Sequence, residues 1–423
     1  MKFKLIYSTL HILINEKGLH RCEPFSFSLS TKQISAVSLQ EKTSAFANSQ
    51  KPKAKNMNNS EITKEDIIRA LSTVQEPDLK QDMITLNMIK DIEVGVGEVR
   101  FTVILTTPAC PLKERIRKEC TDAIHTHVDV ELSVVIDMTS NVTSSRMGGT
   151  LLPNVKNIIA IASGKGGVGK STVTANLAMA LKQSGAKVGI IDADISGPSI
   201  PVMFGAEDMQ PMVNQVDGKN MIQPIMQYGI KMISMGFLAP QDNPVPWRGP
   251  MATQALRQFF NDTDWGELDY LLIDLPPGTS DIHLSLVQLV PVTGAVIVTT
   301  PQKVALSDAT KGLMFFRQPQ INVPVLGVIE NMAYFTPEEL PDNKYYIFGK
   351  DGGKNLAIKY ETQLLGEIPI VQSIREAGDE GRPAVMTEGV VAEIFRNSAE
   401  LLAQQVAIRN ATQEKTQTVQ VKV

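Results

Sequence analysis

The fold of this chain is decided where a hydrophobic run enters a glycine-rich loop, Ile158-Ile159-Ala160-Ile161-Ala162-Ser163-Gly164-Lys165-Gly166-Gly167-Val168-Gly169-Lys170-Ser171. The run predicts a buried strand, and the apolar residues within 171–182 predict the helix that follows the loop. A glycine loop between a strand and a helix suits phosphate binding, because its backbone N–H groups converge on phosphate oxygens at a positive helix terminus. The sequence therefore predicts a phosphate-binding P-loop.

The loop also assigns the nucleotide contacts. We expect Lys170 to neutralise the outer phosphates and Ser171 to ligate Mg²⁺, so that ATP and Mg²⁺ are the predicted cofactors. The other predicted nucleotide-binding residues are Gly164, Lys165, Gly166, Gly167, Val168, Gly169 and Thr172.

Two later apolar runs end in acidic residues, which is the Walker B pattern. Residues 188–191 lead into Asp192 and Asp194, and residues 270–273 lead into Asp274. The carboxyl ends of parallel strands meet at one edge of a sheet, so we expect these carboxylates beside the phosphates. Asp274 is predicted to hold the Mg²⁺ shell through water, although many strands end in aspartate merely as a cap or turn residue.

Short apolar runs that alternate with helical patterns predict the fold class of residues 157–410. Their uniform hydrophobicity suits parallel strands covered on both faces, which is an α/β fold with a doubly wound, mainly parallel sheet. A small α+β domain is predicted ahead of it, over residues 57–137, from helices near 63 and over 112–128 and from three strand-like stretches. The predicted runs of the large domain are 158–162, 188–191, 270–273, 295–299 and 325–329.

The remaining segments are predicted to lack a core. Residues 1–56 are interpreted as an unstructured extension, with a targeting segment or a working start at Met57 left open. Residues 138–156 have no hydrophobic period and predict a flexible linker, and residues 411–423 predict a polar tail.

Composition limits the function classes. The formal charge of −4 gives no general attraction to nucleic acid, and no apolar run of about 18 residues predicts membrane insertion. The three cysteines, Cys22, Cys110 and Cys120, have no paired spacing. Their pattern favours a reducing compartment, and the predicted location is the cytoplasm.

Lys165 departs from a plain Walker loop. It resembles the signature lysine of the deviant Walker A class, which includes the MinD and ParA positioning ATPases, the nitrogenase iron protein and the Mrp family. The resemblance implies a homodimer in which Lys165 reaches the partner's nucleotide, while Asp194 orients the attacking water. A solvated surface lysine is the alternative interpretation of Lys165.

Further motifs narrow the resemblance to the Mrp family of iron-sulfur cluster carriers, over about residues 150–405. This resemblance implies an ATPase that delivers clusters to apoproteins or assembly factors, and it implies that Asn331 hydrogen-bonds the adenine. The motifs are Asp192-Ala193-Asp194-Ile195-Ser196-Gly197-Pro198-Ser199, Trp247-Arg248-Gly249-Pro250-Met251, Pro276-Pro277-Gly278-Thr279 and Ile329-Glu330-Asn331-Met332.

The small domain carries its own resemblance. Its segments 76–78, 86–89 and 106–112 resemble the domain often fused ahead of Mrp ATPases and found alone in iron-sulfur assembly factors. Cys110 precedes the predicted helix, whose dipole is expected to lower the thiol pKa and make it a cluster ligand or transfer thiol. A buried, inert cysteine is the alternative.

One segment departs from the family pattern. Many Mrp proteins carry a Cys-x-x-Cys pair here, and two subunits bind one [4Fe–4S] cluster through four thiolates. In this chain residues 336–344 hold no cysteine, and carboxylates are poor substitutes for thiolates on such clusters. Cluster carriage therefore follows from the resemblance alone.

Two alternative functions stay open. One is a positioning or regulatory ATPase of the MinD or ParA kind, which the acidic charge and the mixed polar tail disfavour. The other is an ATP-gated scaffold without a cluster of its own.

Overall fold

The computed structural model describes residues 62–146, 151–195, 197–216, 218–238, 249–337, 339–340 and 342–419. The predicted extension 1–56 lies outside these residues, as do Cys22, Ser196 and the Trp247-Arg248 pair. In the part of the chain that is described, no helix combines the length and hydrophobicity needed to cross a membrane.

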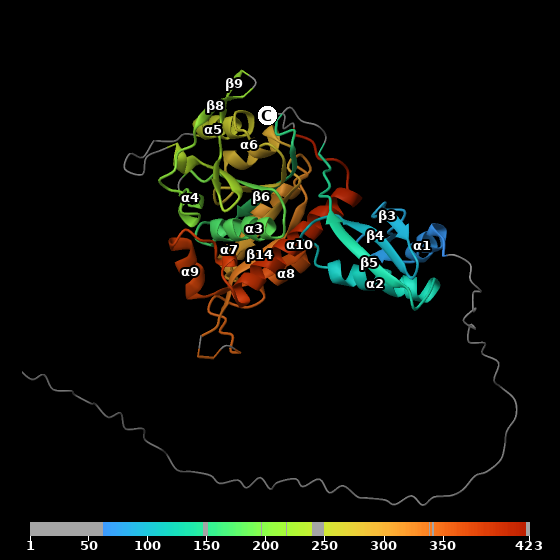
Figure 1. The fold of residues 1–423 in the computed structure, drawn as a ribbon. Coiled ribbons are helices and arrows are strands. Elements are labelled where there is room, and N and C mark those ends of the chain that lie inside the picture. Colours follow the sequence, from blue (N-terminus) through green and yellow to red (C-terminus); the bar gives the residue numbers. More distant parts are fainter. Residues whose placement is uncertain are drawn as a thin grey trace, which may run out of the picture. The chain divides into compact units, whose positions relative to one another are not determined.

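An eight-stranded sheet with the order β10-β11-β7-β12-β6-β13-β14-β15 forms the centre of the P-loop region. Figure 1 labels two of its strands, β6 and β14. Neighbouring strands run parallel except for β10 and β11, which are antiparallel. The predicted α/β fold with a mainly parallel sheet is thereby confirmed. The strands are β6 (Val155–Ser163), β7 (Val188–Asp192), β10 (Ile225–Gln227), β11 (Ile230–Ser234), β12 (Leu268–Asp274), β13 (Gly294–Thr299), β14 (Val325–Phe335) and β15 (Leu364–Ile370).

Helices cover both faces of this sheet, which explains why its strands are apolar throughout. Along β6, Ile159 and Ile161 belong to the hydrophobic cluster that contains α3 and α10. Ile158 and Ala160 point the other way, into the cluster of α5, α6 and α7. The helices are α3 (Lys170–Gln183), α4 (Ile200–Met203), α5 (Gly249–Asn261), α6 (Asp281–Leu289), α7 (Lys303–Arg317), α8 (Gly352–Lys359), α9 (Gln372–Asp379) and α10 (Val390–Thr412); a hairpin of β8 (Val213–Val216) and β9 (Lys219–Ile222) lies outside the sheet.

The segment before the P-loop region builds a separate small core, as the sequence predicts. Its sheet has the order β3-β4-β5, with β3 antiparallel and β5 parallel to the central strand. Alternate residues of β4, such as Phe101 and Val103, are fully buried against the helices. The elements are α1 (Lys64–Leu71), β1 (Gln75–Glu76), β2 (Gln81–Asp82), β3 (Ile89–Val94), β4 (Glu98–Leu105), α2 (Lys113–His127) and β5 (Ser133–Ser140).

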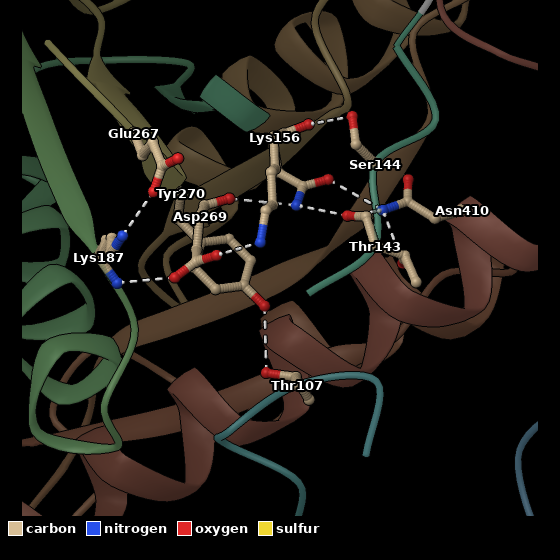
Figure 2. Close-up of polar contacts among 10 residues, drawn as sticks. Thr107, Thr143, Ser144, Lys156, Lys187, Glu267, Asp269, Tyr270 and Asn410 are labelled. Carbon is tan, nitrogen blue, oxygen red and sulfur yellow. Dashed lines mark hydrogen bonds and ion pairs between the residues drawn. The ribbon is translucent and has the colours of Figure 1, made fainter. Parts of the chain in front are cut away.

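The predicted flexible linker, residues 138–156, is wrong at both ends, because β5 continues to Ser140 and β6 begins at Val155. Between them the chain is held by the end of α10. The Asn410 side-chain amide donates to the carbonyl oxygen of Thr143 at 3.0 Å and to Oδ1 of Asn157 at 2.9 Å (Figure 2). A polar side chain of the segment adds to this contact, because the Ser145 hydroxyl donates to Oδ1 of Asn410 at 2.7 Å.

The predicted polar tail, residues 411–423, is also partly wrong. Helix α10 extends to Thr412, and the chain after it packs back as far as it is described. The backbone N–H of Thr416 donates to the Ser145 carbonyl, and that of Val419 donates to the Val287 carbonyl, both at 2.9 Å. Backbone pairing of this kind needs no apolar pattern, so the sequence did not reveal it.

Candidate functional site

The candidate site lies where three adjacent strands end. Strand β12 pairs with β7 and β6, and its last residue, Asp274, is in register with Asp192 and with Ile161. The chain leaves β6 directly into the glycine loop, so both carboxylates lie at the same sheet edge as the loop. This juxtaposition is the one predicted from the acidic strand ends.

Two glycines of the loop are required by close approach of neighbouring groups. A Cβ on Gly164 would lie 2.0 Å from the backbone carbon of Asp308. A Cβ on Gly169, whose φ is +78°, would lie 2.2 Å from Nδ2 of Asn331. The neighbouring backbone therefore requires glycine at 164, and the left-handed φ favours glycine at 169.

Asp274 collects three donors from the first turn of α3. Nζ of Lys170 lies 2.7 Å from Oδ2, and the Ser171 hydroxyl donates to the same oxygen at 2.6 Å. The Thr174 hydroxyl lies 2.6 Å from Oδ1. Asp274 is fully buried and the Lys170 side chain is only 6% exposed. Low solvent access strengthens each of these charge-assisted contacts.

The groups gathered here fit a nucleotide with Mg²⁺. Hydroxyl and carboxylate oxygens are the ligands that Mg²⁺ prefers, and Ser171 and Asp274 bring one of each together. A lysine ammonium and the uncovered amides of a glycine loop bind phosphate oxygens at a helix N-terminus. The roles of Lys170, Ser171 and Asp274 toward a nucleotide stay predictions.

Thr174 is a site residue that the sequence analysis missed. It lies one helical turn after Lys170, on the same face of α3, and its hydroxyl is fully buried. The signal was available, because a threonine four residues after the loop lysine points to the same strand end.

Asp192, which the sequence analysis expects beside the phosphates without assigning it a role, is the last residue of β7. Its fully buried carboxylate accepts hydrogen bonds from the Ile200 N–H at 3.2 Å and the Ser234 hydroxyl at 3.0 Å. Burial, reinforced by the charge of Asp274, raises the pKa of Asp192 well above the ordinary value. Asp192 therefore fixes the loop that carries Asp194, whose N–H donates to Asp192 Oδ1 at 3.2 Å.

Lys165 and Asn331 lie on opposite sides of the loop. Nζ of Lys165 is 3.5 Å from Oε1 of Gln302, at the start of α7. The Asn331 amide donates to the Val168 carbonyl at 2.8 Å and also borders a cavity of about 450 Å³. Mostly apolar walls make this cavity suitable for a flat nucleobase. Its lining includes Thr172, Pro198, Asn331, Ile370 and Ile374.

The expected lowering of the Cys110 pKa is wrong. The thiol precedes α2 by two residues and is partly buried, and burial is the main reason that its pKa is raised. The carboxylates of Asp78, Glu76 and Glu400 raise it further. Burial of the thiol outweighs the hydrogen bond from the Leu112 backbone, which lowers the pKa, and the three carboxylates make smaller contributions in the same direction as burial.

Two residues that flank the segment without the cysteine pair, residues 336–344, are paired with each other. Phe335 and Tyr345 exchange two backbone hydrogen bonds of 2.8 Å, and Nζ of Lys344 lies 4.0 Å from the centre of the Tyr334 ring. Within the described ranges, no group of three or more His, Cys, Asp or Glu side chains is arranged to hold a metal ion.

Comparison with known proteins gives two family matches along the chain. Residues 154–406 match the family model described as ParA, NUBPL iron-transfer P-loop NTPase. Residues 64–134 match the family described as iron-sulfur cluster assembly protein.

Individual relatives agree with these matches. The iron-sulfur cluster carrier protein of Synechocystis sp. is 46% identical over 333 residues, which cover 77% of this chain and 92% of the relative. The protein of the same description from Escherichia coli K12 is 42% identical over 343 residues, which cover 79% of this chain and 90% of the relative. A solved nucleotide-binding protein from Archaeoglobus fulgidus, in complex with ADP, is 40% identical with a TM-score of 0.50, covering 58% of this chain and 93% of that one.

Proposed function

This chain belongs to the NUBPL-type iron-transfer P-loop NTPases, and from that membership we propose that it is an ATP-hydrolysing carrier of iron-sulfur clusters that acts as a homodimer. The family membership confirms the resemblance predicted from the motifs. One observation carries the ATPase half of the proposal: Lys170, Ser171 and Thr174 converge on the buried carboxylate of Asp274.

In the proposed mechanism each of these residues has a separate task. Lys170 binds the outer phosphate oxygens, and Ser171 and Asp274 hold Mg²⁺, which when bound neutralises phosphate charge. Asp194 orients the attacking water, and Asn331 contacts the base at the wall of the apolar cavity. Lys165 crosses to the nucleotide of a second copy, where it stabilises charge on the transferred phosphoryl group.

The ATPase half is tested by nucleotide binding and turnover. We expect Mg²⁺-dependent ATP hydrolysis by the purified chain and loss of ATP binding in Lys170→Ala. Lys187→Ala is a matched control, because Lys187 also pairs with a carboxylate at 2.7 Å but on an exposed surface. Equal ATP binding by Lys170→Ala and the unsubstituted chain would refute the site.

The dimer is tested separately. ATP is expected to shift the chain from monomer to dimer in light scattering, and Lys165→Ala is expected to lower turnover while ATP still binds. If Lys165→Ala keeps full turnover at every protein concentration, Lys165 does not act across a dimer.

The cluster is treated as cargo, passed to apoproteins or assembly factors. Among the described residues Cys110 is a partly accessible thiol, whereas Cys120 is fully buried and burial raises its pKa to about 12. The described cysteines of one chain therefore do not supply a four-thiolate set. We propose Cys110 as a thiol ligand whose proton leaves when iron binds.

Anaerobic reconstitution with iron and sulfide tests this assignment. Cluster bound by the unsubstituted chain and by Cys120→Ala, but lost in Cys110→Ala, is the expected result. Cluster retained by Cys110→Ala would remove Cys110 from the ligand set.

A second candidate function is an ATP-gated scaffold that docks partners without carrying a cluster. The absence of cysteine from residues 336–344 favours it. No bound iron in any variant, together with ATP-dependent binding of an assembly partner, would select the scaffold over the carrier.

A further inference from the structure

His283 is a buried histidine on α6 that takes no part in the site as described so far. Its side chain is 1% exposed and packs beside two phenylalanines of α7. The ring centroid lies 5.8 Å from that of Phe315, nearly perpendicular to it, and 6.4 Å from that of Phe316. An apolar aromatic side chain would pack in this position at least as well. The histidine is therefore explained by a polar contact of its ring and not by packing.

The hydrogen bonding of the ring supplies that reason. Nδ1 of His283 accepts the backbone N–H of Ser280 at 3.2 Å, and the Ser280 hydroxyl lies at the same distance. Because Nδ1 is the acceptor, the proton of the neutral ring is on Nε2. Among the described residues no group pairs with Nε2, which is a cost of about 1–3 kcal/mol for a buried donor. The contact with Ser280 is the interaction that offsets this cost.

Ser280 ends the loop that joins Asp274 to α6. The start of this loop is held against the P-loop region, because the N–H of Leu275 donates to Ile161 at 3.1 Å and that of Gly278 donates to Ser163 at 2.8 Å. A Cβ on Gly166 would lie 3.8 Å from Pro277, so the loop runs beside the glycine loop. At the other end, Thr279 and Ser280 are exposed, and His283 is the buried group that holds the Ser280 amide.

We propose that His283 is a positioning residue for ATP hydrolysis, which holds loop 275–280 against the P-loop by accepting the Ser280 amide proton. The inference rests on the proposed ATPase function. If the Ser280 end were released, the loop would move relative to Asp274 and the nucleotide phosphates. A displacement of about 1 Å in a positioned group can lower turnover by about a hundredfold without removing any contact to substrate.

Two substitutions separate positioning from packing. His283→Phe keeps an aromatic ring in the aromatic surroundings but removes the acceptor. His283→Asn removes most of the ring but keeps an oxygen near the place of Nδ1, so it can still accept the amide proton. Positioning and packing therefore predict opposite rankings of the two variants.

We expect His283→Phe to lower kcat about tenfold or more, with KM for ATP and the Kd of a fluorescent ATP analogue changed by less than about threefold. His283→Asn is expected to retain kcat within about threefold of the unsubstituted chain, even though it unfolds at lower urea concentration. Full turnover by His283→Phe, or a greater loss in His283→Asn than in His283→Phe, would overturn the inference while the ATPase stands. Absence of hydrolysis by the unsubstituted chain would overturn the proposed function and this inference together.

Discussion

Replacing Lys170 by methionine tests the buried ion pair at the centre of the site. The substitution keeps an unbranched side chain of similar length but removes the ammonium that lies 2.7 Å from Asp274 Oδ2. Asp274 is then left fully buried with only the hydroxyls of Ser171 and Thr174 as side-chain donors. Breaking a buried pair from one side costs about 3–5 kcal/mol, so we expect a loss of that size from the free energy of unfolding without nucleotide.

Urea unfolding followed by tryptophan fluorescence is the appropriate assay. Trp265 is 3% exposed in the cluster packed on α5, so its emission reports the core of the P-loop region. Lys187→Met is the matched control, because the Lys187–Glu267 pair has the same 2.7 Å separation but side chains that are 61% and 77% exposed. Water and salt screen such an exposed pair, so its loss is expected to change stability little.

The double variant Lys170→Met with Asp274→Asn completes the test. Removing both charges leaves no buried ion without a partner, so most of the stability lost in Lys170→Met is expected to return. If Lys170→Met lowers the free energy of unfolding no more than Lys187→Met does, burial does not strengthen the central pair and the reasoning fails.

Three further predictions follow from single contacts. Gly169→Ala is expected to abolish ATP binding measured by calorimetry, because the φ of this residue is +78° and its Cβ would lie 2.2 Å from Nδ2 of Asn331. Gly218→Ala is the control and should bind ATP normally, because its φ is a similar +77° but its Cβ would meet no atom within 4 Å. Burial lowers the pKa of His283 to about 4. Between pH 6.5 and 4 the His283 side chain is therefore protonated in the unfolded chain but neutral in the folded chain. The free energy of unfolding should therefore fall between pH 6.5 and 4 by about 3 kcal/mol more in the unsubstituted chain than in His283→Phe. Urea unfolding measured across this pH range would contradict the prediction if both chains lost the same free energy of unfolding. Alkylation of Cys110 by iodoacetamide at pH 7.5 should be slower than that of a free thiol, because the thiol pKa is raised. It should be faster in Glu400→Gln than in the unsubstituted chain, because the Glu400 carboxylate helps to raise that pKa. Equal alkylation rates in these two chains would show that the Glu400 charge does not act on the thiol.

The parts of the fold that the sequence predicted are those governed by local rules. Apolar runs buried on both faces predicted the central strands β6, β7 and β12. The glycine loop after β6 predicted that the carboxyl ends of these strands form the edge of the sheet that carries the site. The sequence analysis did not predict strands β10, β11 and β15, because polar residues or glycine and proline interrupt their short apolar runs. The predicted linker failed for a different reason, since Asn410 lies more than 250 residues from Thr143 and no local pattern announces their hydrogen bond.

Cys110 shows the same limit at a site residue. Position before a helix is a local feature, and on that feature alone a lowered thiol pKa was a sound expectation. Burial of the thiol in the folded chain reverses it, and the carboxylates of Asp78 and of Glu400 on α10 add to that effect. The loop containing Cys110 is also anchored to the nucleotide-binding region, because the Thr107 hydroxyl lies 3.1 Å from the Tyr270 hydroxyl on β12 (Figure 2). Asp274, which we propose to hold the Mg²⁺ shell, lies four residues further along that strand. The same strand therefore also contacts the loop of the proposed cargo thiol.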